Sequence, residues 1–176
     1  NFTISGETID FGPCAFMDAF DPGTVFSSID HHGRYAYGNQ PIIGQWNLAR
    51  FAEALLPLLG DDQEAAVERA QETLSAFTER YESQWLAGMW RKLGVVDAEG
   101  ADPALPTAFT EVLQIQGLDY TSTLRALSRV ARGEPSPSCA SITDIDAFNT
   151  WAEGWLSLLD GQPGGRAGAA ERMDAA

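Results

Sequence analysis

Two oxygen donors near the start of the sequence have the types and the spacing of a metal site. Asn1 carries an amide oxygen and Asp10 carries a carboxylate. The residues between them are typical of two short strands, Phe2–Ile4 and Thr8–Ile9, joined by a tight turn at 5–7. Such a hairpin would bring Asn1 and Asp10 side by side. Because Mg²⁺ takes one or two protein oxygens and completes its shell with water and phosphates, the pair predicts a Mg²⁺ or Mn²⁺ site.

Asp10 also opens an Asp-Phe-Gly triplet. In the kinase fold, the Asp of this triplet and an upstream Asn hold the ions that bridge the ATP phosphates. Gly12 would let the backbone turn sharply after the carboxylate. The same triplet is also an ordinary exit from a strand into a loop, so the alternative that Asn1 and Asp10 only close a turn stays open at this point.

Cys14 lies four residues beyond Asp10. A free cysteine often packs as a small apolar residue, which is the simpler interpretation here. The alternative is a redox-active thiol that pairs with a cysteine beyond this sequence, with Cys139 as a weaker partner. Two cysteines do not make a disulfide scaffold or a zinc site, so we expect reduced thiols and a cytoplasmic protein.

Other polar residues of the same region have simpler interpretations. Asp30-His31-His32 offers no third ligand for a second metal site. Asp18 and Asp21 are typical of turn carboxylates, and Arg34 is expected to form a structural salt bridge rather than to bind a substrate phosphate.

Helices are expected to hold most of the chain together. Residues 14–43 form a long irregular stretch rich in turn formers, whose aromatic residues, including Phe20, indicate that it packs on something. From Gly44 onward, apolar residues recur at helical spacing. The predicted helical stripes run over residues 48–59, 67–89 with a stop at Gly94, 109–113, 120–130 with Asp119 as cap, and 145–159 ending at Gly161.

The fold class is therefore mainly α, or α+β overall, with an N-terminal β-hairpin, a long loop and then a helical bundle. We expect one domain over residues 1–176. Its predicted parts are a metal-binding hairpin (1–13), an activation-type loop (14–43), a helical subdomain (44–161), and a linker with the start of a truncated helix (162–176).

Composition excludes several classes of partner. The 176 residues carry a formal net charge of −14, which argues against a nucleic-acid-binding surface. No apolar run approaches the roughly 20 residues of a membrane span, so no membrane partner is expected.

Five motifs stand together in this sequence. They are Ile9–Asp18 (IDFGPCAFMD), Gly33–Tyr35 (GRY), Asn39–Pro41 (NQP), Trp46–Leu48 (WNL) and Gln116–Thr123 (QGLDYTST). Together they strongly resemble the selenoprotein O family, and the resemblance covers nearly the whole chain.

The resemblance implies a protein-kinase-like fold, of which this chain would be a C-lobe fragment. Family members bind ATP in a flipped orientation and transfer AMP to hydroxyl side chains of proteins, and UMP transfer is also attributed to bacterial members. The implied metal ligands are Asn1 and Asp10, with Asp10 also next to the nucleotide. The implied protein is cytoplasmic in bacteria and mitochondrial in eukaryotes.

The same resemblance implies that essential parts lie outside this sequence. The family's catalytic base is an Asp directly before the residue that corresponds to Asn1, and the phosphate-binding Lys and Arg belong to an upstream lobe. We therefore expect an internal fragment that is inactive alone. Two alternatives remain: a conventional kinase lobe that transfers the γ-phosphate of ATP, and a non-catalytic helical interaction module.

Overall fold

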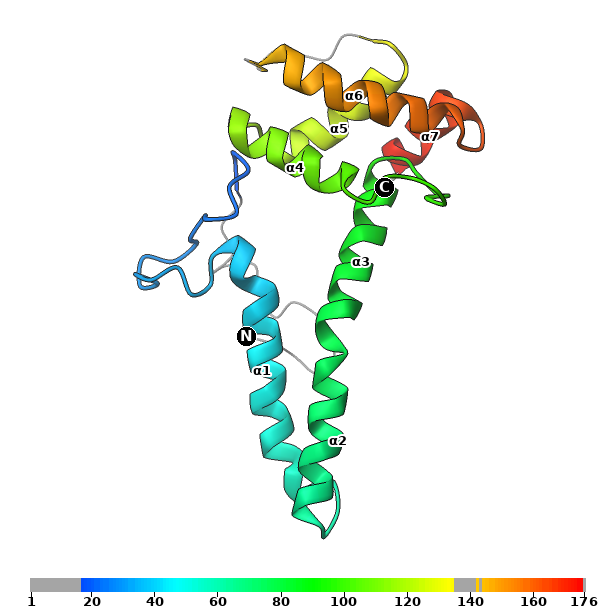
Figure 1. Cartoon of the computed structure of the whole chain (residues 1–176). Coiled ribbons are helices and arrows are strands. Elements are labelled where there is room, and N and C mark those ends of the chain that lie inside the picture. Colours follow the sequence, from blue (N-terminus) through cyan, green and yellow to red (C-terminus); the bar gives the residue numbers. More distant parts are fainter. Residues whose placement is uncertain (1–16, 135–141, 143, 176) are drawn as a thin grey trace. The chain divides into compact units, whose positions relative to one another are not determined.

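The computed structural model describes residues 17–134, 142 and 144–175 (Figure 1). This part of the chain is mainly helical and contains no strand, which confirms the mainly α class. The predicted hairpin at residues 1–13 lies outside the described residues. Its elements are η1 (Tyr37–Asn39), α1 (Gln40–Leu55), η2 (Leu56–Leu58), α2 (Gln63–Ser75), α3 (Phe77–Lys92), α4 (Leu105–Gln116), α5 (Tyr120–Ala131), α6 (Ile145–Asp160) and α7 (Gly165–Ala175).

The described residues divide into two compact units. The first comprises Pro22–Ser83, and the second comprises Met17–Asp21 together with residues 84–175. Helix α3 contributes to both units, and the single domain expected over residues 1–176 stays a prediction. Among the described residues, no helix is both long and apolar enough to cross a membrane.

In the first unit, α1 packs against α2 and against the short helices η1 and η2. Helix α1 begins at Gln40 and not at Gly44, so the prediction that irregular structure extends to residue 43 is wrong. Pro41 occupies the first turn, where its missing N–H costs nothing and its fixed φ favours the helix. The preceding 3-10 turn η1 leads directly into this start.

The long stripe predicted over residues 67–89 forms two helices instead of one. Helix α2 ends at Ser75 and α3 begins at Phe77. Ala76, the single residue between them, keeps right-handed backbone angles (φ −77°, ψ −6°). Asp62 caps α2 by accepting hydrogen bonds from the N–H groups of Glu64 and Ala65 at 3.0 and 3.2 Å. The predicted stop is confirmed, because Gly94 follows α3 with a φ of +76°.

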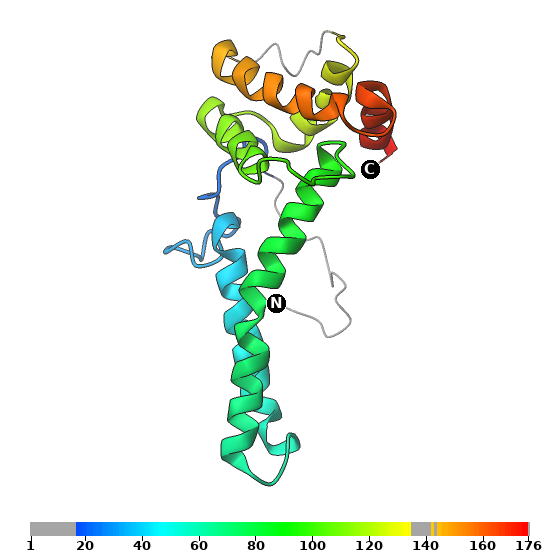
Figure 2. The ribbon, with the colours of Figure 1, turned by 45° about the vertical axis from the view of Figure 1, so that its right-hand side comes forward.

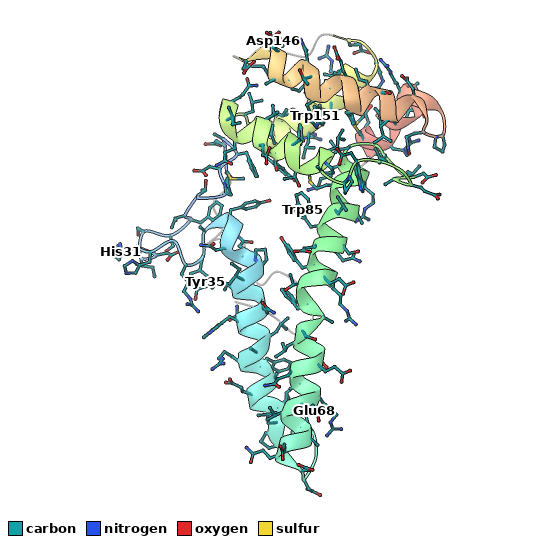
Figure 3. The ribbon with its side chains drawn as sticks, viewed as in Figure 1. His31, Tyr35, Glu68, Trp85, Asp146 and Trp151 are labelled. Atoms are coloured by element: carbon teal, nitrogen blue, oxygen red, sulfur yellow. The ribbon has the colours of Figure 1, made fainter. Side chains whose placement is uncertain are left out.

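The second unit holds a layered aromatic core. Helix α6 packs on α4 and α7, and α5 packs on α7 (Figure 2). Trp151 lies on the side of α6 that faces α4 (Figure 3), stacks on Trp155 with ring centroids 5.3 Å apart, and contacts Phe109 at 4.8 Å. The indole N–H of Trp155 donates to the carbonyl of Leu93 at 2.9 Å, so even the fully buried indole has its polar atom paired.

The stretch after α6 was predicted as a linker but forms a tight turn held by Gln162. The side-chain oxygen of this buried residue accepts the N–H groups of Val96 and Asp97 at 2.9 and 3.0 Å, and its amide donates to the Asp97 carbonyl at 2.7 Å. Helix α7 then begins at Gly165. The guanidinium of Arg172 donates to the carbonyl of Gly94, which ties α7 to the end of α3.

Candidate functional site

The residues predicted to hold the metal, Asn1 and Asp10, lie outside the described residues, as does Cys14. Their roles stay predictions. The described segment that follows them, Met17–Asp21, shows how the chain beyond the Asp-Phe-Gly triplet is held.

Met17–Asp21 docks on the junction between α4 and α5, and we call its contact with Leu118–Tyr120 the anchor. The Phe20 N–H donates to the Leu118 carbonyl at 2.8 Å, and Ala19 forms an isolated antiparallel bridge with Asp119. Phe20 is only 7% exposed, and its ring stacks on Tyr120 with centroids 5.6 Å apart and an interplanar angle of 26°. Both the backbone and the side chain of the segment are therefore fixed.

The junction that receives Phe20 is built by local sequence signals. Gly117 ends α4 in the left-handed region (φ +60°), where glycine has no Cβ to clash. Asp119 then caps α5 by accepting the Ser122 N–H at 2.5 Å. The tight turn between the two helices leaves the Leu118 carbonyl available to the Phe20 N–H.

Tyr120 is also held through its hydroxyl, by two partners that the sequence did not reveal. Its hydroxyl accepts a hydrogen bond from the ammonium of Lys92 at 3.1 Å and donates to the sulfur of Met89 at 3.4 Å. The same ammonium lies 5.1 Å from the ring centroid, a cation–π geometry. Lys92 is the only lysine of the chain and lies in the last turn of α3. From the sequence alone, a basic residue at this position indicates only a favourable interaction with the helix dipole.

The cap formed by Asp119 makes the stability of the fold depend on pH. Its pKa is lowered first by the backbone hydrogen bond from Ser122 and then by the hydroxyl of the same residue. A lowered folded-state pKa stabilises the fold above the unfolded-state value of 3.8, and this contribution is lost as the pH falls through the folded-state pKa. We expect Asp119→Asn to be less stable than the wild type near neutral pH, and the gap to close below about pH 3.8. Urea denaturation across this range checks the expectation, and a gap that does not change with pH contradicts it.

In the first unit, Asp30 organises the loop that precedes α1. Its two carboxylate oxygens accept the N–H groups of Arg34 and Tyr35, each at 2.8 Å. Asn39 closes the loop by donating from its side chain to the Gly33 carbonyl at 2.8 Å. Asp30 is therefore a turn carboxylate. The neighbouring His31 is exposed on this loop (Figure 3), and the described ranges contain no group of three His, Cys, Asp or Glu that could hold a metal.

Arg34 does not form the predicted salt bridge within the described ranges. Its guanidinium lies over the ring of Trp46, 4.7 Å from the centroid, and 5.8 Å from that of Tyr35. Arg50 approaches the same indole at 5.5 Å. The backbone N–H of Arg34, and not its guanidinium, is what contacts the Asp30 carboxylate.

A family model described as protein adenylyltransferase SelO matches residues 1–172. The chain belongs to the SelO family. The resemblance inferred from the five motifs is thereby confirmed.

Curated members of the SelO family are similar to this chain throughout. It is 49% identical over 181 aligned residues to the protein nucleotidyltransferase YdiU of Rhizobium etli (strain CIAT 652), an alignment that covers 100% of the chain and 36% of the relative. It is 52% identical over 162 residues to the YdiU of Halalkalibacterium halodurans, which covers 92% of the chain and 32% of that relative. The chain thus spans about a third of the length of these relatives.

The SelO-like motifs fall into both units. Motifs 33–35, 39–41 and 46–48 form the loop before α1 and the first half of α1, including the arginine–tryptophan contact. The motif Gln116–Thr123 forms the junction that receives Phe20. The part of the motif Ile9–Asp18 that the structure describes is Met17–Asp18, which belongs to the segment that docks on the junction motif.

Proposed function

We propose that this chain is part of a metal-dependent protein adenylyltransferase, which transfers AMP from ATP to Ser, Thr or Tyr hydroxyls of protein substrates. The observation that carries the proposal is the match of residues 1–172 to the adenylyltransferase family model. The curated relatives are named protein nucleotidyltransferases, which supports the same reaction class.

The donor set at the start of the chain fits a hard divalent cation. An amide oxygen from Asn1 and a carboxylate from Asp10 are the ligand types that Mg²⁺ and Mn²⁺ take when phosphates and water complete the shell. A bound cation would offset the negative charge of the triphosphate. Asp10 would also lie beside the nucleotide.

The reaction joins the acceptor hydroxyl oxygen to the α-phosphorus and breaks the bond between that phosphorus and the oxygen of the leaving pyrophosphate. The hydroxyl proton passes to a general base, which the family resemblance assigns to an Asp directly before Asn1. Positioning and charge neutralisation supply most of the catalysis, as in phosphoryl transfer. Because the chain spans about a third of the length of its curated relatives, the reaction is to be tested with the complete protein.

The position of the label in ATP tests the reaction. With the complete protein and a mixture of substrate proteins, we expect protein-bound label from [α-³²P]ATP and none from [γ-³²P]ATP. Label from the γ-position would instead show a conventional kinase. No labelling with either nucleotide, and no thermal shift with Mg²⁺ or Mn²⁺ and ATP, would favour a non-catalytic helical module. Protein-bound label from [α-³²P]UTP would measure UMP transfer.

A further inference from the structure

Residues 24–37 form a compact loop in the first unit, and its two ends are joined by backbone hydrogen bonds. The Tyr37 N–H donates to the Thr24 carbonyl at 3.1 Å, and the Gly38 N–H donates to the Pro22 carbonyl at 2.8 Å. Closed loops of this length, which pack on their own residues, are frequently functional. The loop is therefore held at its base, where η1 begins.

Asp30 fixes the part of the loop that carries Arg34 and Tyr35. Its two carboxylate oxygens accept the backbone N–H groups of these residues, each at 2.8 Å, which offsets the charge of the carboxylate and orders the backbone. The side chains of Arg34 and Tyr35 are both exposed. Because the backbone that carries them is already ordered, a partner that binds these side chains does not have to order the loop first.

The Arg34 side chain lies against one face of α1. Its guanidinium is 4.7 Å from the ring centroid of Trp46, and that of Arg50 is 5.5 Å from the same centroid. Ile42 and Arg50 stand four residues before and after Trp46, so the three share one helix face. Tyr35, Trp46 and Ile42 are 44%, 46% and 66% exposed. We call the five residues Arg34, Tyr35, Ile42, Trp46 and Arg50 the arginine–tryptophan surface.

The composition and the charge of this surface indicate what it binds. Trp, Tyr and Arg are the residue types that contribute most to binding at protein interfaces. Residues 22–52 contain a single acidic side chain, Asp30, although the whole chain contains 25. Arg50 is paired with Glu53 at 2.5 Å, but no described residue accepts a hydrogen bond from the guanidinium of Arg34. Its N–H donors are therefore open to a carboxylate, which a planar guanidinium can bind through two of them.

We propose that the arginine–tryptophan surface is a docking site for an acidic segment of a partner protein. A carboxylate of that segment pairs with Arg34, and a neighbouring apolar side chain packs on Trp46 and Ile42. A long polyanion such as a nucleic acid is disfavoured, because it would extend beyond the acid-poor residues of a chain whose net charge is −14. A short acidic segment contacts the acid-poor surface alone. This interaction goes beyond the proposed function and does not rest on it.

Binding of a defined peptide to the complete protein tests the proposal. The probe is the fluorescein-labelled peptide Gly-Asp-Glu-Leu-Phe-Asp-Glu-Gly, and its matched control, Gly-Asn-Gln-Leu-Phe-Asn-Gln-Gly, lacks the side-chain carboxylates. Fluorescence polarisation is expected to show saturable binding of the acidic peptide to the wild type. The neutral peptide should bind at least about fivefold more weakly, and Arg34→Ala and Trp46→Ala should each weaken binding of the acidic peptide by at least about fivefold. Arg34→Lys is also expected to weaken it, because Lys keeps the charge but lacks the planar fork.

An arginine elsewhere in the same unit serves as the matched control for charge. Arg80 is exposed in the first turn of α3, and Arg80→Ala removes the same charge as Arg34→Ala. It is expected to leave the affinity for the acidic peptide unchanged. Equal weakening by Arg80→Ala and Arg34→Ala would show that only net charge matters and would overturn the proposal. Circular dichroism checks that each variant is folded, and should Trp46→Ala not fold, the two substitutions of the exposed Arg34 decide.

The other possible occupants of the surface are distinguishable outcomes. Absence of saturable peptide binding by the complete wild-type protein refutes the proposal. Wild-type dimers that Trp46→Ala dissociates, measured by analytical ultracentrifugation, would then assign the surface to a second copy of the protein. Protection of Trp46 from hydroxyl-radical labelling in a monomer would assign it to another part of the same chain. Tighter binding of a fluorescein-labelled single-stranded oligonucleotide than of the acidic peptide would refute the proposal in favour of nucleic acid. Because peptide binding is measured without ATP, the result does not depend on whether the protein transfers AMP.

Discussion

Replacing Asp10 with alanine in the complete protein is expected to reduce AMP transfer by at least about 100-fold. The carboxylate is the charged member of the proposed donor pair, and the remaining amide of Asn1 is a weak ligand for Mg²⁺ by itself. Metal-based charge stabilisation supplies several kcal/mol of transition-state energy, and each 1.36 kcal/mol corresponds to about tenfold in rate. Transfer of label from [α-³²P]ATP to substrate protein measures the loss.

A matched carboxylate shows whether the loss is specific to the metal site. Asp146 is exposed in the first turn of α6, and Asp146→Ala removes the same charge from a chain whose net charge is −14 (Figure 3). We expect Asp146→Ala to transfer AMP at close to the wild-type rate. Both variants should keep the wild-type circular dichroism spectrum. Retained AMP incorporation in folded Asp10→Ala would reject Asp10 as a metal ligand.

Local signals explain why the helices could be predicted from the sequence. Asp119 caps α5 as expected, because a side-chain acceptor before an apolar stripe is a strong start signal. The stops at Gly94 and Gly117 follow from the left-handed backbone that only glycine adopts without strain. The early start of α1 at Gln40 was missed because Pro41 is compatible both with the first turn of a helix and with an ordinary turn, and the 3-10 turn η1 leads directly into the helix.

The contacts that build the candidate site are long-range, and this is why the sequence could not reveal them. Phe20 could be expected to pack on something, but nothing in its surroundings identifies Leu118 and Tyr120 as its partners. Gln162 looked like part of a glycine-rich linker, because its hydrogen bonds go to residues 96 and 97, far away in the chain. Arg34 was expected to form a salt bridge, but its guanidinium lies over the ring of Trp46, twelve residues further along the chain.

The largest effect on stability is expected at Gly94. A Cβ added there would lie 2.9 Å from the carbonyl oxygen of Ala169 and 3.1 Å from its Cβ, both in α7. Ala169 is itself fully buried, so α7 would have to move away from the end of α3. The substitution also places a Cβ at a φ of +76°. Backbone strain of about 1–2 kcal/mol and overpacking of about 1–3 kcal/mol together predict that Gly94→Ala lowers the free energy of unfolding by about 2–5 kcal/mol.

Gly133→Ala separates the strain from the steric clash. Gly133 has nearly the same φ, +73°, but a Cβ there would have no atom within 4 Å among those compared. It should therefore lose only about 1–2 kcal/mol. Chemical denaturation gives both free energies, and hydrogen exchange of the α7 amides shows whether the extra loss comes from that helix. If both variants lose the same free energy of unfolding and the α7 amides exchange equally slowly in both, α7 can move away from the added Cβ without a measurable loss of stability. The contact between Gly94 and Ala169 would then not be what holds α7 in the second unit.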